Sequence, residues 1–351
     1  MAFQFFSTDL GIDLGTSNVL ISAEKAGVVL REPSVVAVDK NTGKLLQVGS
    51  AARNMLGRTP GNVVAMQPLK GGVISDHDMT VKMLQDLFRK AIKSNLFNPK
   101  PRVVISVPSG VTQMEERNVI NAAIEAGARR VYLIEEPMAA ALGAGLDISG
   151  AKGHMVVDIG GGTTDIAVLT MNEVANSTSC KIAGTTFDEA IAWYVRQKRG
   201  LVIGQNTAEE IKIQIGCVYP PQTDASMLVS GRDVKTSLPK KITLQATEIY
   251  ENVLRKLAKQ IGDEIVSVLE DTSPELVGDI AENGITLTGG GSQIAGMEAF
   301  LTERTGIRCR IADDPASCVA YGCGKSLGWI SAMNEGPINI AKKRIMRRGY
   351  F

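Results

Sequence analysis

The sequence predicts an α/β fold made of two related halves, each with a mixed β-sheet. Candidate strands alternate with candidate helices along the chain, as in domains that pack helices against a sheet. A glycine-rich string also occurs twice, because Gly11-Ile-Asp-Leu-Gly-Thr-Ser-Asn18 returns in altered form as Val157-Asp-Ile-Gly-Gly-Gly-Thr-Thr-Asp165. In each copy an apolar run leads to an Asp and a turn, and a second apolar run follows, which is the pattern of a β-hairpin. The 351 residues are enough for two such halves.

Apolar periodicity and capping residues predict the remaining elements in order. Strands are expected at 103–107, 131–134, 155–157 and 285–288. A helix begins after Ser75 or Asp76 and places on one face the apolar residues Leu84, Leu87, Phe88, Ala91 and Ile92. Capping boxes predict three more helix starts. Thr112 with Glu115 opens a helix at 113–126, which ends at Gly127, and the other two boxes are Thr186 with Glu189 and Thr207 with Glu210. A longer helix is expected at 247–270, and β-rich insertions at 31–69 and 217–245.

Composition and charge exclude several classes of protein. The chain is 44% hydrophobic and 21% charged, which is ordinary for a soluble globular protein, and its net charge of +1 creates no field that selects nucleic acid. The five cysteines form no CxxC pair, which argues against a zinc site or a disulfide scaffold and suits a reducing cytosol. The N-terminus lacks a secretory signal, and no apolar run reaches the roughly 20 residues of a membrane-spanning helix. We therefore expect a cytoplasmic protein with no nucleic-acid partner.

The two glycine-rich turns are candidate phosphate-binding sites, because closely spaced glycines let several backbone N–H groups point at one anion. The residues concerned are Gly15, Thr16, Ser17 and Asn18 in the first turn and Gly160, Gly161, Gly162, Thr163 and Thr164 in the second. Asp13 and Asp158 precede the turns, and a carboxylate beside a phosphate needs a cation between them. Mg²⁺ suits this place, since one or two carboxylates and phosphate oxygens hold it. The alternative is that the glycines only form hairpins and the aspartates only cap turns, but the duplication favours phosphate binding.

Two other segments carry candidate functional residues. Gly289, Gly290, Gly291 and Ser292 follow the strand 285–288 and precede a candidate helix at 293–304, where backbone amides could contact a nucleotide, although a plain strand-to-helix turn has the same pattern. Glu136 stands between a strand and a helix, just before Pro137. Its carboxylate either positions an attacking water or only interacts with the helix dipole, and the local sequence favours the second interpretation. Neither a P-loop nor a dinucleotide fingerprint occurs.

Together these strings resemble the superfamily of actin, sugar kinases and heat-shock chaperone ATPases. Asp13-Leu-Gly-Thr16 is similar to its first phosphate motif, Asp158-Ile-Gly-Gly-Gly-Thr163 to its second, and Ile285-Thr-Leu-Thr-Gly-Gly-Gly291 to its adenosine motif. Glu136-Pro-Met-Ala-Ala-Ala141 and Ala320-Tyr-Gly-Cys-Gly324 resemble its two connecting helices. Almost end to end, the chain resembles the MreB family of bacterial filament proteins, as in Glu32-Pro-Ser-Val-Val-Ala37 and Met55-Leu-Gly-Arg-Thr-Pro-Gly-Asn62.

This resemblance implies an actin-like (ribonuclease H-like) fold with four subdomains around a nucleotide cleft. The first half would be 1–145 with a small insertion at 31–69, and the second 146–310 with an insertion at 181–241. A helix at 311–335 would return to the first half, and 336–351 would be a basic tail. The resemblance also implies slow ATP hydrolysis with Mg²⁺, coupled to homopolymer filaments. These filaments would lie on the inner face of the cell membrane and guide cell-wall elongation proteins and rod shape.

The resemblance also assigns roles to residues. Thr16, Ser17, Asn18 and Gly160–Gly162 would contact the β- and γ-phosphates, and Asp13 and Asp158 would hold Mg²⁺ through water. Glu136 would orient the attacking water with help from Thr164. This role replaces the interaction with the helix dipole that the local sequence of Glu136 favours. Glu209 and Lys212 would meet the adenosine, opposite Gly289–Ser292. The chain departs from its relatives in two places, since no lysine follows the first turn, as it does in actin, and Asp165 stands where many relatives carry Glu.

Two further features concern function. Leu96 and Phe97 precede Pro99, and the resemblance implies that an apolar pair at this place inserts into lipid, whereas the local sequence favours packing on the core. The apolar start Met1–Phe6 and the basic tail Lys342–Phe351 could add weak attraction to an anionic membrane. A small-molecule kinase and a chaperone ATPase are the alternatives on this fold. The length and the absence of a substrate-pocket insertion favour the polymer.

Overall fold

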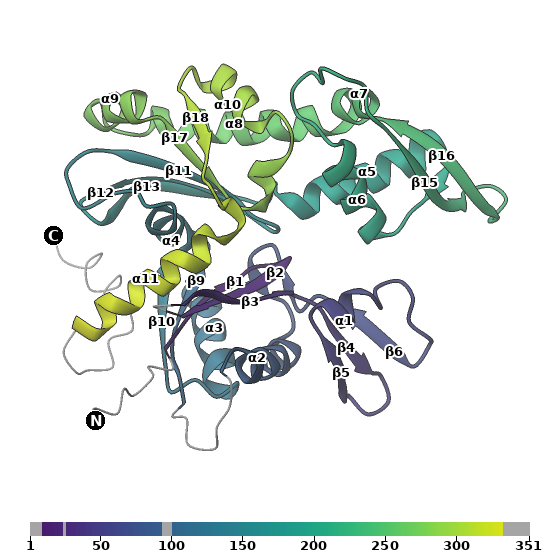
Figure 1. The fold of residues 1–351 in the computed structure, drawn as a ribbon, viewed down its shortest axis with the longest axis horizontal. Coiled ribbons are helices and arrows are strands. Elements are labelled where there is room, and N and C mark those ends of the chain that lie inside the picture. Colours follow the sequence, from purple (N-terminus) through teal and green to yellow (C-terminus); the bar gives the residue numbers. More distant parts are fainter. Residues whose placement is uncertain (1–8, 24–25, 93–99, 333–351) are drawn as a thin grey trace. The chain divides into compact units, whose positions relative to one another are not determined.

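The computed structural model describes residues 9–23, 26–92 and 100–332, and Leu96 and Phe97 lie outside the described residues. The chain divides into two compact units, Met1–Asp147 with Ser317–Phe351 (unit 1) and Ile148–Ala316 (unit 2). Figure 1 shows the elements of each. The domain bounds drawn from the sequence at 145 and 310 stay a prediction.

Unit 1 is built on a five-stranded sheet in the order β10-β9-β1-β2-β3. Its strands are β1 (Leu10–Leu14), β2 (Asn18–Ala23), β3 (Gly27–Pro33), β9 (Arg102–Val107) and β10 (Arg130–Glu135). Its helices are α1 (Ser50–Arg53), α2 (His77–Ala91), α3 (Gln113–Glu125), α4 (Glu136–Gly143) and α11 (Cys318–Ala332). A small sheet of β4 (Val36–Asp39), β5 (Leu45–Val48) and β6 (Val63–Met66) and the pair β7 (Leu69–Lys70) and β8 (Val73–Ile74) complete it.

Unit 2 repeats the arrangement with the sheet β13-β12-β11-β17-β18. Its strands are β11 (His154–Ile159), β12 (Thr164–Thr170), β13 (Glu173–Cys180), β17 (Ile285–Thr288) and β18 (Cys309–Ile311). Its α-helices are α5 (Gly184–Arg199), α6 (Gln205–Ile215), α7 (Ala246–Ile249), α8 (Arg255–Glu270), α9 (Pro274–Asn283) and α10 (Met297–Thr305). A small sheet joins β14 (Leu201–Val202), β15 (Ser226–Asp233) and β16 (Pro239–Gln245).

The two large sheets have the same strand directions. In unit 1, β1 pairs antiparallel with β2 and parallel with β9, and in unit 2, β11 pairs antiparallel with β12 and parallel with β17. The glycine-rich turns therefore occupy equivalent places, each joining the central strand to its antiparallel neighbour. The mixed sheets and the duplication that the repeated string predicted are both confirmed.

One face of each sheet buries an apolar core under helices. In unit 1, Ile12 and Leu14 of β1 pack in one cluster with Leu84 and Leu87 of α2, which confirms the predicted apolar face of that helix. In unit 2, Val157 and Ile159 of β11 pack with residues of α5 and α8. Since side chains alternate along a strand, Asp13 and Asp158 are directed to the opposite face of their sheets.

Helix starts were predicted correctly where a local side-chain cap decides them. Asp76 accepts a hydrogen bond from the Met79 N–H and caps α2, and Thr112 with Glu115 forms a complete capping box on α3. The capping boxes predicted at Thr186 and Thr207 were wrong, because α5 begins earlier, after Ala183, and α6 after Gly204. The start of α5 is fixed by tertiary bonds described below.

Two other segments differ from their predicted form. The helix expected at 247–270 contains a π-helical turn over Tyr250–Leu254, between α7 and α8. The helix expected at 293–304 is wrong at its start, because Gly290–Gln293 forms a 3₁₀ turn and α10 begins only at Met297. The chain is extended at Ile294 and left-handed at Gly296 (φ 83°), and both conformations interrupt an α-helix.

Candidate functional site

The first glycine-rich turn, between β1 and β2, is held from outside by two neighbouring loops. The Ser34 hydroxyl donates to the Gly15 carbonyl oxygen (2.5 Å), and the Ser34 N–H donates to the Ser17 carbonyl oxygen (3.0 Å). The hydroxyl of Thr16 is buried and accepts from the Gly72 N–H (2.9 Å). The turn is thus a fixed loop, braced by Ser34 and Gly72, which the sequence did not indicate because they are distant along the chain.

The second turn, between β11 and β12, is braced by the start of α5. The N–H groups of Gly184 and Thr185 donate to the carbonyl oxygens of Gly160 (3.0 Å) and Gly161 (2.8 Å). The Gly160 N–H donates to the Thr163 carbonyl oxygen (2.9 Å), and the Thr164 N–H is engaged with Cys180. The N–H groups of Gly161, Gly162 and Thr163 are the ones that the turn can offer to an anion.

Two other predicted residues of this turn are buried. Thr163 is 7% exposed and Thr164 is fully buried, where its hydroxyl donates to the Ile182 carbonyl oxygen (2.6 Å). That bond uses the only proton of the Thr164 hydroxyl, so toward a water molecule the hydroxyl can act only as an acceptor.

The third glycine turn lies directly against the second in unit 2. A Cβ on Gly289 would collide with the Ile159 carbonyl, and a Cβ on Gly291 would meet the Ile159 side chain. Ile159 immediately precedes Gly160, so the glycines let Gly289–Ser292 approach the end of β11. The hydroxyl of Ser292 is turned back onto the Gly289 carbonyl oxygen (2.7 Å). The structure therefore brings the second phosphate turn and the predicted adenosine turn together.

Asp158 lies in a row of buried polar side chains. The strand registers place it beside Asp165 on β12 and beside Thr288 on β17, and all three are less than 5% exposed. Burial raises the pKa of Asp158 to about 7, the Thr288 hydroxyl opposes this, and the Asp165 carboxylate adds to it. Two buried carboxylates side by side repel each other, so a cation would stabilise the pair.

Lys212 of α6 is directed toward the start of α5. Its ammonium pairs with the Asp188 carboxylate (2.8 Å) and donates to the Gly184 carbonyl oxygen (3.0 Å), and both side chains are mostly buried. Since Gly184 is bonded to Gly160, the ammonium lies next to the residues that brace the second phosphate turn. Asp188 was missed at the sequence level, because a single Asp in a helix carries no signal of its partner. Glu209 lies on the same helix, one turn earlier.

In unit 1, Asp13 and Glu136 both act on the buried thiol of Cys323. Burial raises the pKa of Cys323 well above its usual range, and the carboxylates of Asp13 and, more weakly, Glu136 raise it further. Glu136 is the first residue of α4 and is 8% exposed. The preceding Glu135 accepts a hydrogen bond from the Ser109 hydroxyl (3.1 Å). Both carboxylates thus lie within electrostatic reach of Cys323, although they are far apart in the sequence.

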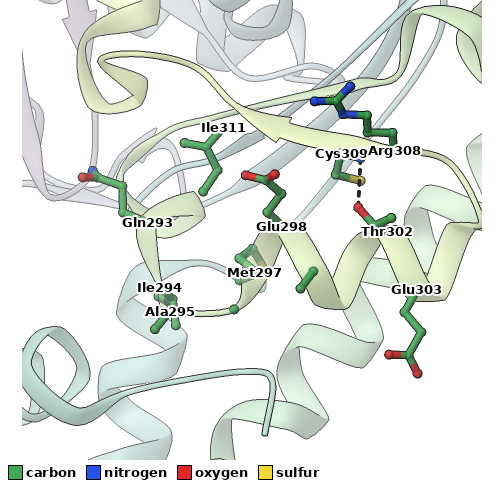
Figure 2. A pocket seen from close by; sticks show the side chains of 12 residues that line it. Gln293, Ile294, Ala295, Met297, Glu298, Thr302, Glu303, Arg308, Cys309 and Ile311 are labelled. Atoms are coloured by element: carbon green, nitrogen blue, oxygen red, sulfur yellow. Dashed lines mark hydrogen bonds between the residues drawn. The ribbon is translucent and has the colours of Figure 1, made fainter. Parts of the chain in front are cut away.

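A separate cavity of about 680 Å³ lies beside α10 and β18 (Figure 2). It is lined by residues 293–299 and by Thr302, Glu303, Arg308, Cys309 and Ile311. Thr302 joins its two walls by accepting a hydrogen bond from the Cys309 N–H (3.0 Å). None of the predicted phosphate or adenosine residues lines it.

The protein's own side chains do not make a complete metal site in the described part of the chain. Over residues 9–23, 26–92 and 100–332, no group of three or more His, Cys, Asp or Glu side chains could hold a metal ion. Within the same ranges, no helix is long and apolar enough to span a bilayer.

Comparisons with known proteins agree with this architecture. The profile of the family described as MreB/Mbl protein matches residues 7–335. The cell shape-determining protein MreB of Escherichia coli K12 is 47% identical over 329 residues, which cover 93% of this chain and 94% of that protein. The structure of MreB5 of Spiroplasma citri bound to AMPPNP has a TM-score of 0.87 at 38% identity and covers 92% of this chain and 96% of its own; a structure of MreB5 bound to ADP is equally similar. The MamK double helical filament has a TM-score of 0.77 at 23% identity, and the match covers 91% of this chain and 98% of the MamK chain.

The fold and the paired glycine turns define the class as actin-like, an α/β fold with mixed sheets and flanking helices. The family profile matches nearly the whole chain, and it identifies the protein more narrowly than the fold class does. The chain belongs to the MreB/Mbl family, and its relatives include cell shape-determining proteins.

Proposed function

We propose that the chain is an ATP-binding cytoskeletal protein that hydrolyses ATP slowly, polymerises into filaments and takes part in determining cell shape. One observation carries the nucleotide part, namely two equivalent glycine turns, each preceded by an Asp near the end of a central strand. Such turns offer backbone N–H groups to phosphates. The structures of the relative MreB5 bound to AMPPNP and to ADP support this proposal.

Magnesium fits the residues of unit 2. Asp158 is a buried carboxylate beside a second one, and burial raises its pKa to about 7, so a cation there would relieve an unfavourable charge. Asp158 and its counterpart Asp13 would hold Mg²⁺ through water, and the ion would neutralise charge on the phosphates. The N–H groups of the second turn would bind phosphate oxygens, while Gly289–Ser292, Glu209 and Lys212 would contact the adenosine.

Unit 1 would supply the groups that orient the reaction. Thr16, Ser17 and Asn18 would contact phosphate oxygens, and Glu136 would accept a hydrogen bond from the attacking water. Thr164, which belongs to unit 2, would be a second acceptor. No covalent intermediate with the protein is needed, because phosphoryl transfer to water rests on positioning and charge stabilisation. The buried start of α4 keeps the Glu136 carboxylate in a restricted place.

The filaments would lie on the inner face of the cell membrane and would guide cell-wall elongation proteins. Support for this comes from the family, whose members include cell shape-determining proteins. The apolar pair Leu96 and Phe97 and the basic tail from Lys342 would provide attraction to lipid. The protein would thus be cytoplasmic and peripheral on the membrane.

Titration of a fluorescent ATP analogue, with and without Mg²⁺, tests the nucleotide part. Wild-type protein should bind the analogue more tightly with Mg²⁺. Asp13→Asn and Asp158→Asn should each raise the Mg²⁺ concentration needed by about 10-fold, the usual scale for disturbing a metal site. No binding by the wild type would overturn the proposal. Tight binding without assembly, together with phosphate transfer to a small hydroxyl compound, would favour a kinase instead.

A further inference from the structure

Thr288 is the residue on β17 that lies directly beside Asp158 on β11. The two strands are parallel, and their register pairs Asp158 with Thr288 although 130 residues separate them. Both side chains are therefore on the same face of the sheet. The Thr288 hydroxyl donates to Asp158 Oδ1 at 2.6 Å, and both residues are buried.

This hydrogen bond determines which oxygen of Asp158 remains for other contacts. A carboxylate has two oxygens, and rotation about its last bond exchanges them unless one is held. The Thr288 hydroxyl holds Oδ1 with its single proton.

We propose that Thr288 is a positioning residue that orients Asp158 for Mg²⁺, while making no contact with the ion itself. This inference rests on the proposed function, since it needs Asp158 to hold the cation. Residues that hydrogen-bond a metal-binding carboxylate commonly change metal affinity about 10-fold to 100-fold when they are replaced. The motif Thr288–Gly291 thus has two tasks, because its glycines approach Ile159 while its threonine holds Asp158.

The test replaces Thr288 by Val, which removes the hydroxyl at nearly constant size, and by Ser, which keeps a donor. Thr286→Val is the matched control, because Thr286 lies two residues earlier on the same face of β17 and is also buried. Mn²⁺ binding to the nucleotide complex is followed by electron paramagnetic resonance. Binding of the fluorescent nucleotide is measured separately in EDTA.

Thr288→Val should weaken Mn²⁺ binding about 10-fold and leave nucleotide affinity in EDTA within about 2-fold, and Thr288→Ser should restore most of the Mn²⁺ affinity. Thr286→Val should resemble the wild type. Equal Mn²⁺ affinity for Thr288→Val and wild type would overturn the inference, as would an equal loss in Thr286→Val. Failure of the wild type to bind nucleotide at all would instead contradict the proposed function, so the two failures are distinguishable.

Discussion

At the residue scale, the roles that could be predicted from the sequence are those whose signal is local. Asp13 and Asp158 each stand two residues before a turn glycine, so the pattern alone predicts a role for them. The partners Thr288, Asp188 and Ser34 were not, because strand register and helix packing bring them in from distant segments. The assignment of Glu136 depended on family resemblance, since its local sequence is that of an ordinary helix start.

The pair of Lys212 and Asp188 gives the first prediction at this scale. Asp188→Leu should lower the free energy of unfolding by about 3–5 kcal/mol, because it leaves a mostly buried ammonium without its carboxylate. The double variant Asp188→Leu/Lys212→Met should recover much of that loss, since no buried charge remains. Urea unfolding without nucleotide measures both. Additive losses in the double variant would show that the two side chains are not energetically coupled.

Glu136 gives the second prediction. Glu136→Gln should slow phosphate release at least about 10-fold while filaments are retained, because the amide accepts a proton poorly but has the same shape. Glu135→Gln is the control, since Glu135 precedes it in the chain and accepts from Ser109. A rate for Glu136→Gln equal to that of Glu135→Gln would remove Glu136 from the catalytic step.

At the element scale, helix starts show which boundaries a sequence can predict. The capping box at Thr112 has both of its partners within four residues, so the start of α3 could be predicted from the sequence. The start of α5 was misplaced because the Gly184 and Thr185 N–H groups bond to the second phosphate turn, and that tertiary contact outweighs the local pattern at Thr186. The 3₁₀ turn after Gly289 was missed for a similar reason, since it depends on the contact with Ile159.

The crossing of α4 and α11 gives the third prediction. A Cβ on Gly322 would collide with the Ala139 carbonyl, so the helix backbones touch there. Gly322→Ala should destabilise the protein by about 1–3 kcal/mol through overpacking. Gly278→Ala in α9 is the control, because a Cβ added there would meet nothing within 4 Å, and a helical Ala should be neutral or stabilising by about 0.5–1 kcal/mol. Similar unfolding midpoints for both variants would contradict the close crossing.

At the scale of the whole molecule, the fold class followed from order and duplication. Five short motifs in one sequence, two of them related, predicted two equivalent mixed sheets, and the strand orders confirm it. Assembly could not be predicted from the residues in this way, because filament contacts join different copies and leave no periodic signal within one chain.

Leu96 and Phe97 give a prediction at this scale. The double variant Leu96→Ser/Phe97→Ser should keep nucleotide-dependent filaments in solution but lose most binding to anionic liposomes, because burial of apolar side chains drives insertion. Loss of nucleotide binding in the same variant would point to a role in the core instead.

Sedimentation of the wild-type protein with anionic liposomes, followed by electron microscopy of the pellets, tests the central claim most directly. It compares Mg-ATP, Mg-ADP and no nucleotide. The account predicts filaments on the lipid with Mg-ATP and few or none without nucleotide. Nucleotide binding with no filaments under any of these conditions would contradict it.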